Sequence, residues 1–386
     1  MREQHVYVQA APLGNAAAVA DAVEHIFTAL PAAGRLTPES RVLIKPNLLA
    51  AHEPACAVTT HPHVLRGVIL ALQKRGVQSI VVADSPGGFV SPANVRAIFQ
   101  QCGVQAVCDE LGATAWSDCE SIGEKAGPGS LVRRFTLIEP ALSCDFIVNL
   151  PKLKTHVLTG LSGAVKNLFG CVPGLRKTEF HMRFPDKEDF GQMLADLCET
   201  VQADIHIVDA LLAMEGDGPG SGGTPRQLDM LLGSEDPYQL DLALCRYINM
   251  PPAQVPYLAA AMRQGLCPPA FDPALLVCEA ALKAPIEGFC PPRTYEGKVD
   301  FSINVPAFLR PAFSFLARGA AAPRPVVRKA KCIGCGKCAG ICPQDIIALP
   351  SKKAVISYKK CIRCFCCHEI CPVQAIEVRH FPLFTQ

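Results

Sequence analysis

The distribution of hydrophobic residues predicts alternating strands and helices over residues 1–300. Short runs rich in Val, Ile and Leu have the length and composition of buried strands; they lie at Arg41–Lys45, Ser79–Ala83, Asp145–Leu150, Ile205–Val208 and Leu228–Leu232. Stretches with helical spacing lie at Ala16–Leu30, Val64–Arg75 and Phe190–Gln202, and Ser91 followed by Pro92 suits the start of a further helix. This alternation predicts an α/β domain with an open, mostly parallel sheet.

The composition and the placement of the cysteines limit the class of protein. The chain has 386 residues, of which 49% are hydrophobic and 19% charged, and this suits two or three packed domains. Nine of the twenty cysteines fall between Cys332 and Cys371, which indicates metal ligation in a reducing cytoplasm more than a disulfide scaffold. The first residues lack the basic and apolar runs of a signal peptide. Prolines and arginines interrupt the apolar segment 305–322, so we expect no membrane span.

The cysteines near the C-terminus form a repeated motif. Cys332, Cys335, Cys338 and Cys342 follow the spacing C-x2-C-x2-C-x3-C before Pro343, and Cys361, Cys364, Cys367 and Cys371 repeat it before Pro372. The offset is 29 residues throughout, which indicates an internal duplication. In this spacing three cysteines of one loop hold a [4Fe-4S] cluster, and the fourth ligates the other cluster.

We therefore expect a ferredoxin-like domain with two [4Fe-4S] clusters. The first would be held by Cys332, Cys335, Cys338 and Cys371, and the second by Cys361, Cys364, Cys367 and Cys342. A pair of four-cysteine zinc sites is the alternative, but zinc ribbons need neither a third cysteine at short spacing nor a tandem copy in register. Cys366 is expected to be a packing residue or a substitute ligand. Residues 328–380 resemble bacterial-type two-cluster ferredoxins, which implies electron exchange with a redox partner protein.

The net charge of +2 conceals an asymmetry along the chain. From Arg324 to the end there are 11 Lys and Arg against 3 Asp and Glu, whereas the first 323 residues carry 26 against 32. A basic domain can bind nucleic acid. Thiolate-ligated clusters are themselves anionic, however, and lysines offset that charge, so we expect no nucleic-acid partner.

The chain divides into two expected domains, residues 1–300 and 328–386, joined by a linker. The linker, residues 301–327, is rich in proline and alanine. Its aromatic residues Phe308, Phe313 and Phe315 are expected to pack against the α/β domain, or else to touch a membrane or a partner.

Polar residues follow the predicted strands, at the sheet edge where open parallel sheets bind ligands. We assign Lys45, Asn47, Asp84, Ser85, Lys152, Asn167 and Lys177 to substrate binding, and Lys154, His156, Lys166 and His181 to catalysis. Each of these alone could be a solvated loop residue, but so many on one edge favour a site. The lysines suit a small carboxylate or phosphate ligand. The two histidines could act as proton donors, since imidazole titrates near neutrality.

A glycine-rich run, Gly218–Gly223, matches G-x-G-x-x-G. It leads into a strand-like segment and not into a helix, so a dinucleotide site is not supported. We expect a flexible lid or a tight crossover loop.

The motifs VLIKPNLL, TTHPHV, VVADSPGG, NLPKLKTHVLTGLSGAVKNLFGCVPG and IVDALLAMEGDGPGSGG together resemble the family catalogued as domain of unknown function 362. The resemblance covers roughly residues 5–290 and is most specific in the KLKTH and AVKNLFG blocks. It implies an α/β fold associated with iron-sulfur chemistry in cytoplasmic, often anaerobic, metabolism. It supplies no substrate.

Two functional hypotheses follow. In the first, the protein is an oxidoreductase that moves single electrons to or from a small anionic substrate at the α/β domain. In the second, it is a non-catalytic electron carrier or cluster-handling partner, with the α/β domain as a docking module. The converging lysines and histidines favour the first. Two one-electron centres do not by themselves perform two-electron chemistry, so a flavin is possible, although no flavin motif is recognisable.

Overall fold

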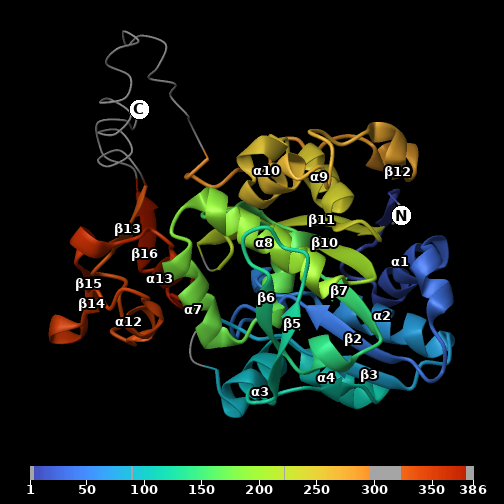
Figure 1. Ribbon diagram of the computed structural model, residues 1–386, viewed down its shortest axis with the longest axis horizontal. Coiled ribbons are helices and arrows are strands. Elements are labelled where there is room, and N and C mark those ends of the chain that lie inside the picture. The colour runs from blue at the N-terminus through green and yellow to red at the C-terminus, as the bar shows by residue number, and fades with distance from the viewer. Residues whose placement is uncertain (1–3, 88–89, 221, 296–322, 380–386) are drawn as a thin grey trace, which may run out of the picture.

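The computed structural model describes residues 4–87, 90–220, 222–295 and 323–379, which form a large α/β domain and a small C-terminal domain (Figure 1). Residues 301–322 of the expected linker, with Phe308, Phe313 and Phe315, lie outside these ranges. None of the helices in the described ranges is long and apolar enough to cross a lipid bilayer.

One ten-stranded sheet runs through the described part of the α/β domain, in the order β12-β1-β11-β10-β7-β2-β3-β4, with β8 paired to β10 and β9 to β8. The strands are β1 (Val6–Ala10), β2 (Arg41–Pro46), β3 (Ser79–Val82), β4 (Thr114–Ala115), β7 (Phe146–Leu150), β8 (Lys152–His156), β9 (Gly160–Ser162), β10 (Ile205–Gly216), β11 (Gly223–Ser234) and β12 (Leu276–Val277). β2 is parallel to β3 and β7, and β10 is parallel to β7 and β8. These pairings confirm the predicted open, mostly parallel sheet.

Helices cover both faces of this sheet, because the side chains of its central strands alternate between two apolar cores. On β2, Val42 and Ile44 belong to the core that holds α1 to α4, while Leu43 belongs to the core of α8 to α10. In Figure 1, α9 and α10 lie at the top of the α/β domain and α3 and α4 at the bottom. The helices are α1 (Ala16–Ala29), α2 (Pro62–Lys74), α3 (Pro92–Gln101), α4 (Val104–Leu111), α5 (Pro140–Ser143), α6 (Ala164–Asn167), α7 (Gly174–Arg183), α8 (Lys187–Val201), α9 (Pro237–Tyr247) and α10 (Pro256–Arg263). A separate hairpin pairs β5 (Ile122–Ala126) with β6 (Arg134–Ile138).

The small domain has two related halves. Its elements are β13 (Arg324–Val327), α12 (Lys337–Ile341), β14 (Ile347–Ala348), β15 (Val355–Ile356), α13 (Cys366–Glu369) and β16 (Ile376–Arg379). β13 pairs with β16, and β14 with β15. Residues 324–327, expected in the linker, are therefore part of the small domain's sheet.

The expected strands and helices lie where the hydrophobic pattern predicts them, with two exceptions that matter for the site. The polar residues 152–156, expected to follow a strand, form the buried strand β8 themselves. The strand that begins at Ile205 does not end at Val208 but runs to Gly216 as one arm of a long hairpin with β11. The start of α3 is as predicted, since the Ser91 side chain accepts a hydrogen bond from the Asn94 N–H.

Candidate functional site between the two domains

Two of the predicted ligand-binding lysines are held in buried ion pairs. Lys45 Nζ lies 3.1 Å from Asp84 Oδ1, and Lys152 Nζ lies 2.8 Å from Asp209 Oδ2. Both lysines are fully buried, and neither lines a cavity described below. Each therefore neutralises a carboxylate inside the domain, which favours a structural role, and their assignment to substrate binding stays a prediction.

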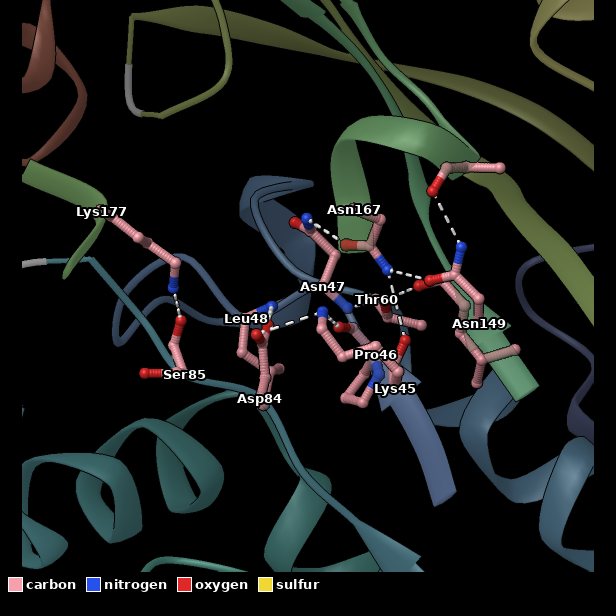
Figure 2. Close-up of polar contacts among 12 residues, drawn as sticks. Lys45, Pro46, Asn47, Leu48, Thr60, Asp84, Ser85, Asn149, Asn167 and Lys177 are labelled. Carbon is pink, nitrogen blue, oxygen red and sulfur yellow. Dashed lines mark hydrogen bonds and ion pairs between the residues drawn. The ribbon is translucent and has the colours of Figure 1, made fainter. Parts of the chain in front are cut away.

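The Lys45–Asp84 pair is covered closely by backbone. A side chain on Gly170 would collide with Asp84 Oδ1 and with the Lys45 ammonium. Asp84 Oδ2 accepts a hydrogen bond from the Leu48 N–H at 2.7 Å, so the carboxylate also fixes the chain after β2 (Figure 2). Only glycine permits this approach, which accounts for the glycine of the AVKNLFG motif.

Three asparagines from three segments join the strand ends. Asn47 Nδ2 donates to Asn167 Oδ1 at 2.8 Å, and Asn167 Nδ2 donates to Asn149 Oδ1 at 2.7 Å (Figure 2). Lys154 Nζ donates to Asn47 Oδ1 at 2.7 Å and to the Val58 carbonyl at 2.8 Å. Both of these acceptors are uncharged, whereas the ammonium groups of Lys45 and Lys152 are each paired with a carboxylate. The network fixes the side chains that form one wall of the cavity.

A cavity of about 110 Å³ lies beside this network and brings together most of the predicted site. Among the predicted residues, its lining includes Asn47, Asp84, Ser85, Lys154, His156, Lys166, Asn167, Lys177 and His181. Lys177 donates to the Ser85 carbonyl, as Figure 2 shows, and its ammonium lies 5.9 Å from the Phe169 ring centroid. Lys166 approaches the same ring at 5.5 Å. The volume suits a small molecule.

Burial changes the ionisation of these groups in a way that the sequence does not reveal. Desolvation lowers the pKa of Lys154 to about 7 and that of Lys177 to about 7, and it also lowers the pKa of Lys166. Desolvation lowers the pKa of His181 to about 3 and that of His156 well below its ordinary value. Both histidines are therefore neutral at pH 7. The predicted role of proton donor fits the two lysines better than the imidazolium ions first expected.

The other wall of the cavity belongs to the small domain, through Ile341, Cys366, Glu369 and Ile370. Glu369 Oε1 lies 3.5 Å from His156 Nε2. His156 Nδ1 accepts a hydrogen bond from the Leu158 N–H at 3.1 Å, which leaves Nε2 to carry the proton of the neutral ring, on the side of Glu369. Burial raises the pKa of Glu369, and Lys166 partly opposes that effect.

The glycine-rich run between β10 and β11 receives the small domain. A side chain on Gly220 would collide with the Glu369 carbonyl, and one on Gly222 with the His368 ring. His368 Nε2 lies 2.9 Å from the Asp217 carbonyl and Nδ1 lies 2.6 Å from the Ile376 carbonyl. In the described part of this run, Gly220 and Gly222 therefore allow α13 to pack closely. The run, expected to be a flexible lid or a tight crossover loop, is the turn of the β10–β11 hairpin.

The motif cysteines surround two further cavities within the small domain. One is lined by Cys332, Cys335, Cys338 and Cys371, and the other by Cys342, Cys361, Cys364 and Cys367. In the described ranges, no group of three His, Cys, Asp or Glu side chains has the geometry to hold a single metal ion. The Ala354 N–H donates to Cys332 Sγ at 3.4 Å and the Ala375 N–H to Cys371 Sγ at 3.2 Å.

Several contributors to the site were absent from the sequence-based assignment, among them Asn149, Glu369 and Cys366. Asn149 lies at the end of a predicted strand, and its position beside other polar strand ends could have identified it. Glu369 and Cys366 carry no such signal, because they reach the cavity only through the docking of one domain on the other.

The fold and the site define an α/β protein with an iron-sulfur domain of the ferredoxin type set against the ends of its strands. A family model for a 4Fe-4S dicluster domain matches residues 324–372, which supports iron-sulfur electron transfer over zinc binding. The model of the domain of unknown function DUF362 matches residues 42–246, and the chain belongs to this family.

Among curated proteins, the chain is similar to the thylakoid-associated protein sll1697 of Synechocystis sp., with 33% identity over 240 residues, 61% of this chain and 71% of the relative. Among solved structures, it is similar to a lactate racemase apoprotein from Thermoanaerobacterium thermosaccharolyticum (11% identity, TM-score 0.41, covering 66% of this chain and 59% of the other). A Thermotoga maritima protein is similar at 12% identity and a TM-score of 0.34, covering 56% of this chain and 54% of the other. The chain thus spans less than two thirds of these two structures, and likeness at this level says nothing about its ligand.

Proposed function

We propose that the protein is an iron-sulfur oxidoreductase that exchanges single electrons between its ferredoxin domain and a small anion bound in the cavity between the domains. The observation that carries this proposal is the composition of the cavity wall. Lys154, Lys166 and Lys177 come from the α/β domain, while Cys366 and Glu369 come from the helix that also bears Cys367. A bound anion would therefore lie beside the cysteines of the second set. A cytoplasmic setting stays a prediction from the cysteine usage.

The cysteine sets fit two [4Fe-4S] clusters, and we assign each set of four to one cluster, with Cys371 and Cys342 exchanged between the loops. Clusters bound there would supply or accept one electron at a time. The backbone N–H groups of Ala354 and Ala375 point at cysteine sulfurs, as is typical of ligands that stabilise cluster charge. Chemical analysis should find about eight iron and eight sulfide per chain. Stoichiometric zinc would contradict the assignment.

The charges around the cavity favour an anion of carboxylate or phosphate type. Lys45 is already paired with Asp84. The cavity lysines Lys154, Lys166 and Lys177 face one carboxylate from the small domain, that of Glu369. An anion would supply the missing negative charge and restore the ordinary, protonated state of the lysines. With a pKa of about 7, Lys154 and Lys177 could then pass a proton to a reduced ligand.

The alternative, in which the α/β domain docks another protein, is less well supported. The strand ends that such a partner would use are covered by the chain's own α13 and by Ile341. A protein ligand would have to displace the small domain from this edge.

The cavity is tested by anion binding to the intact, cluster-loaded protein. Sulfate, phosphate and malonate should raise the midpoint of thermal unfolding, by the equivalent of about 2.7 kcal/mol at a concentration one hundred times the dissociation constant. Lys166→Met should remove this response and leave the cluster absorbance intact. Lys283→Met is the matched control, because Lys283 is an exposed lysine of the α/β domain. An equal response in wild type and Lys166→Met, or no response to any anion, would refute the proposal.

A further inference from the structure

The end of the small domain that points away from the α/β domain has a distinct chemistry. Figure 1 shows β14 and β15 at this end, remote from the large sheet. Lys353 Nζ, from the segment joining β14 to β15, donates to the Cys332 carbonyl, and Lys352 packs beside Gly334. The start of the first cysteine loop, residues 332–334, therefore lies at the same outer end.

This outer end exposes both apolar and basic groups. Ile333 is 62% exposed, and Cys335 is exposed beside it. The side chains of Lys329, Lys331 and Lys352 are also exposed. This end thus combines an exposed isoleucine near a motif cysteine with exposed lysines two and four residues before it, and with Lys352 against Gly334.

The acidic residues of the small domain do not offset these lysines. Glu369 faces the interdomain cavity, and Glu377 is paired with Arg328 at 2.7 Å and with Arg379 at 3.4 Å. Asp345 follows Cys342, in the other half of the domain. The lysines of the outer end are therefore offset by the charge of a bound cluster and by no acidic side chain of the small domain.

We propose that this outer end, centred on Ile333 and Cys335 with Lys329, Lys331 and Lys352 around them, docks an acidic one-electron carrier protein. Charge complementarity selects an acidic partner, because a carrier with a negative patch is steered toward the lysines. The first cysteine set borders this end through Cys332 and Cys335, and the second set borders the cavity through Cys367, next to Cys366. Electrons would enter at one end of the domain and leave at the other. This inference rests on the proposed clusters but does not depend on the anion in the cavity.

A small acidic flavodoxin is a suitable probe, because its colour reports its redox state. Its anionic flavin hydroquinone loses one electron and no proton to become the neutral semiquinone, and the ferredoxin domain gains that electron. The binding of oxidised flavodoxin to the intact protein, measured by calorimetry, gives a readout that needs no turnover. Anaerobic stopped-flow mixing with the hydroquinone, without any cavity ligand, gives the transfer rate.

The test variant is Lys329→Glu/Lys331→Glu/Lys352→Glu, which spares Lys353 and its contact with Cys332. At low ionic strength it should lose about tenfold or more in both flavodoxin affinity and transfer rate, and added salt should slow only the wild type. Its reduced form should transfer electrons faster than wild type to basic cytochrome c. Arg133→Glu/Arg263→Glu/Lys283→Glu carries the same charge change on exposed residues of the α/β domain and should match wild type.

Three results would overturn the inference. Equally weak binding of flavodoxin by both triple variants would show that overall charge, and not the outer end, determines the affinity. The lysine variant could match wild type, or salt could leave the wild-type affinity unchanged. The cluster absorbance of each variant is measured first. If the triple lysine variant has lost it, flavodoxin binding is measured with the single variants Lys329→Glu and Lys352→Glu instead.

Discussion

Replacing Lys152 tests whether this residue of the KLKTH motif serves the fold or the ligand. Lys152→Met keeps the length of the side chain and removes the charge. The variant would leave Asp209 fully buried, with backbone N–H donors from His61 at 2.6 Å and Leu211 at 3.0 Å but without its cation. Removing one partner of a buried ion pair costs about 3 to 5 kcal/mol, because the other charge stays in a medium that solvates it poorly.

The size of this effect is large enough to measure by urea unfolding. With an m-value of about 3 kcal/mol/M, the midpoint should fall by about 1 to 1.7 M. Trp116 is the single tryptophan of the sequence, and its ring packs against the core of the α/β domain, so its fluorescence reports this domain. The control is Arg134→Met, which breaks an exposed pair with Glu124, with side chains 69% and 59% exposed, and should change stability by less than about 0.5 kcal/mol.

The double variant Lys152→Met/Asp209→Asn distinguishes an ion-pair effect from a packing effect. Asparagine keeps an oxygen for the backbone N–H donors but carries no charge. The double variant should be more stable than the sum of the two single changes predicts, by about 1 to 3 kcal/mol. Additive losses, or a Lys152→Met protein as stable as wild type, would refute the structural role of the pair.

Two further predictions concern the cavity and the docking of the domains. Sulfate should bind tightly below pH 7 and more weakly above it, because Lys154 and Lys177 lose their protons as the pH passes their pKa of about 7. The affinity should fall by up to about tenfold per pH unit for each lysine. Calorimetry from pH 6 to 9 measures this affinity, and a constant value would contradict the prediction. Gly222→Val should push α13 away from the hairpin and raise the radius of gyration in solution scattering, since its side chain would meet the His368 ring, whereas Gly14→Val has nothing within 4 Å and should not.

The parts of the site that depend on local sequence could be predicted from it. The two cysteine loops repeat a spacing that predicts which cysteines line the same cavity, and the hydrophobic runs indicate where strands end and polar residues gather. Nine of the predicted edge residues line one cavity for this reason.

The rest of the site depends on contacts between distant segments. Lys45 and Lys152 look like Lys154 in the sequence, and only the positions of Asp84 and Asp209 show that the first two are neutralised. The strand β8 is buried although most of its side chains are polar, so the distribution of hydrophobic residues predicts a loop there. The role of Gly220 and Gly222 follows from the approach of α13, which no pattern within the hairpin indicates.

The arrangement of charge links the two ends of the proposed electron path. Lysines beside α13 lower the free energy of any negative charge in their neighbourhood, whether it arrives as an electron in the small domain or as an anion in the cavity. An anion that neutralises these lysines would therefore make reduction of a cluster held by the nearby cysteine set harder, and by thermodynamic reciprocity that reduction would weaken binding of the anion by the same factor. A product more negative than its substrate would be released most readily when the domain is reduced again. Lys154, Lys166 and Lys177 would thus both bind the ligand and couple its release to reduction of the small domain.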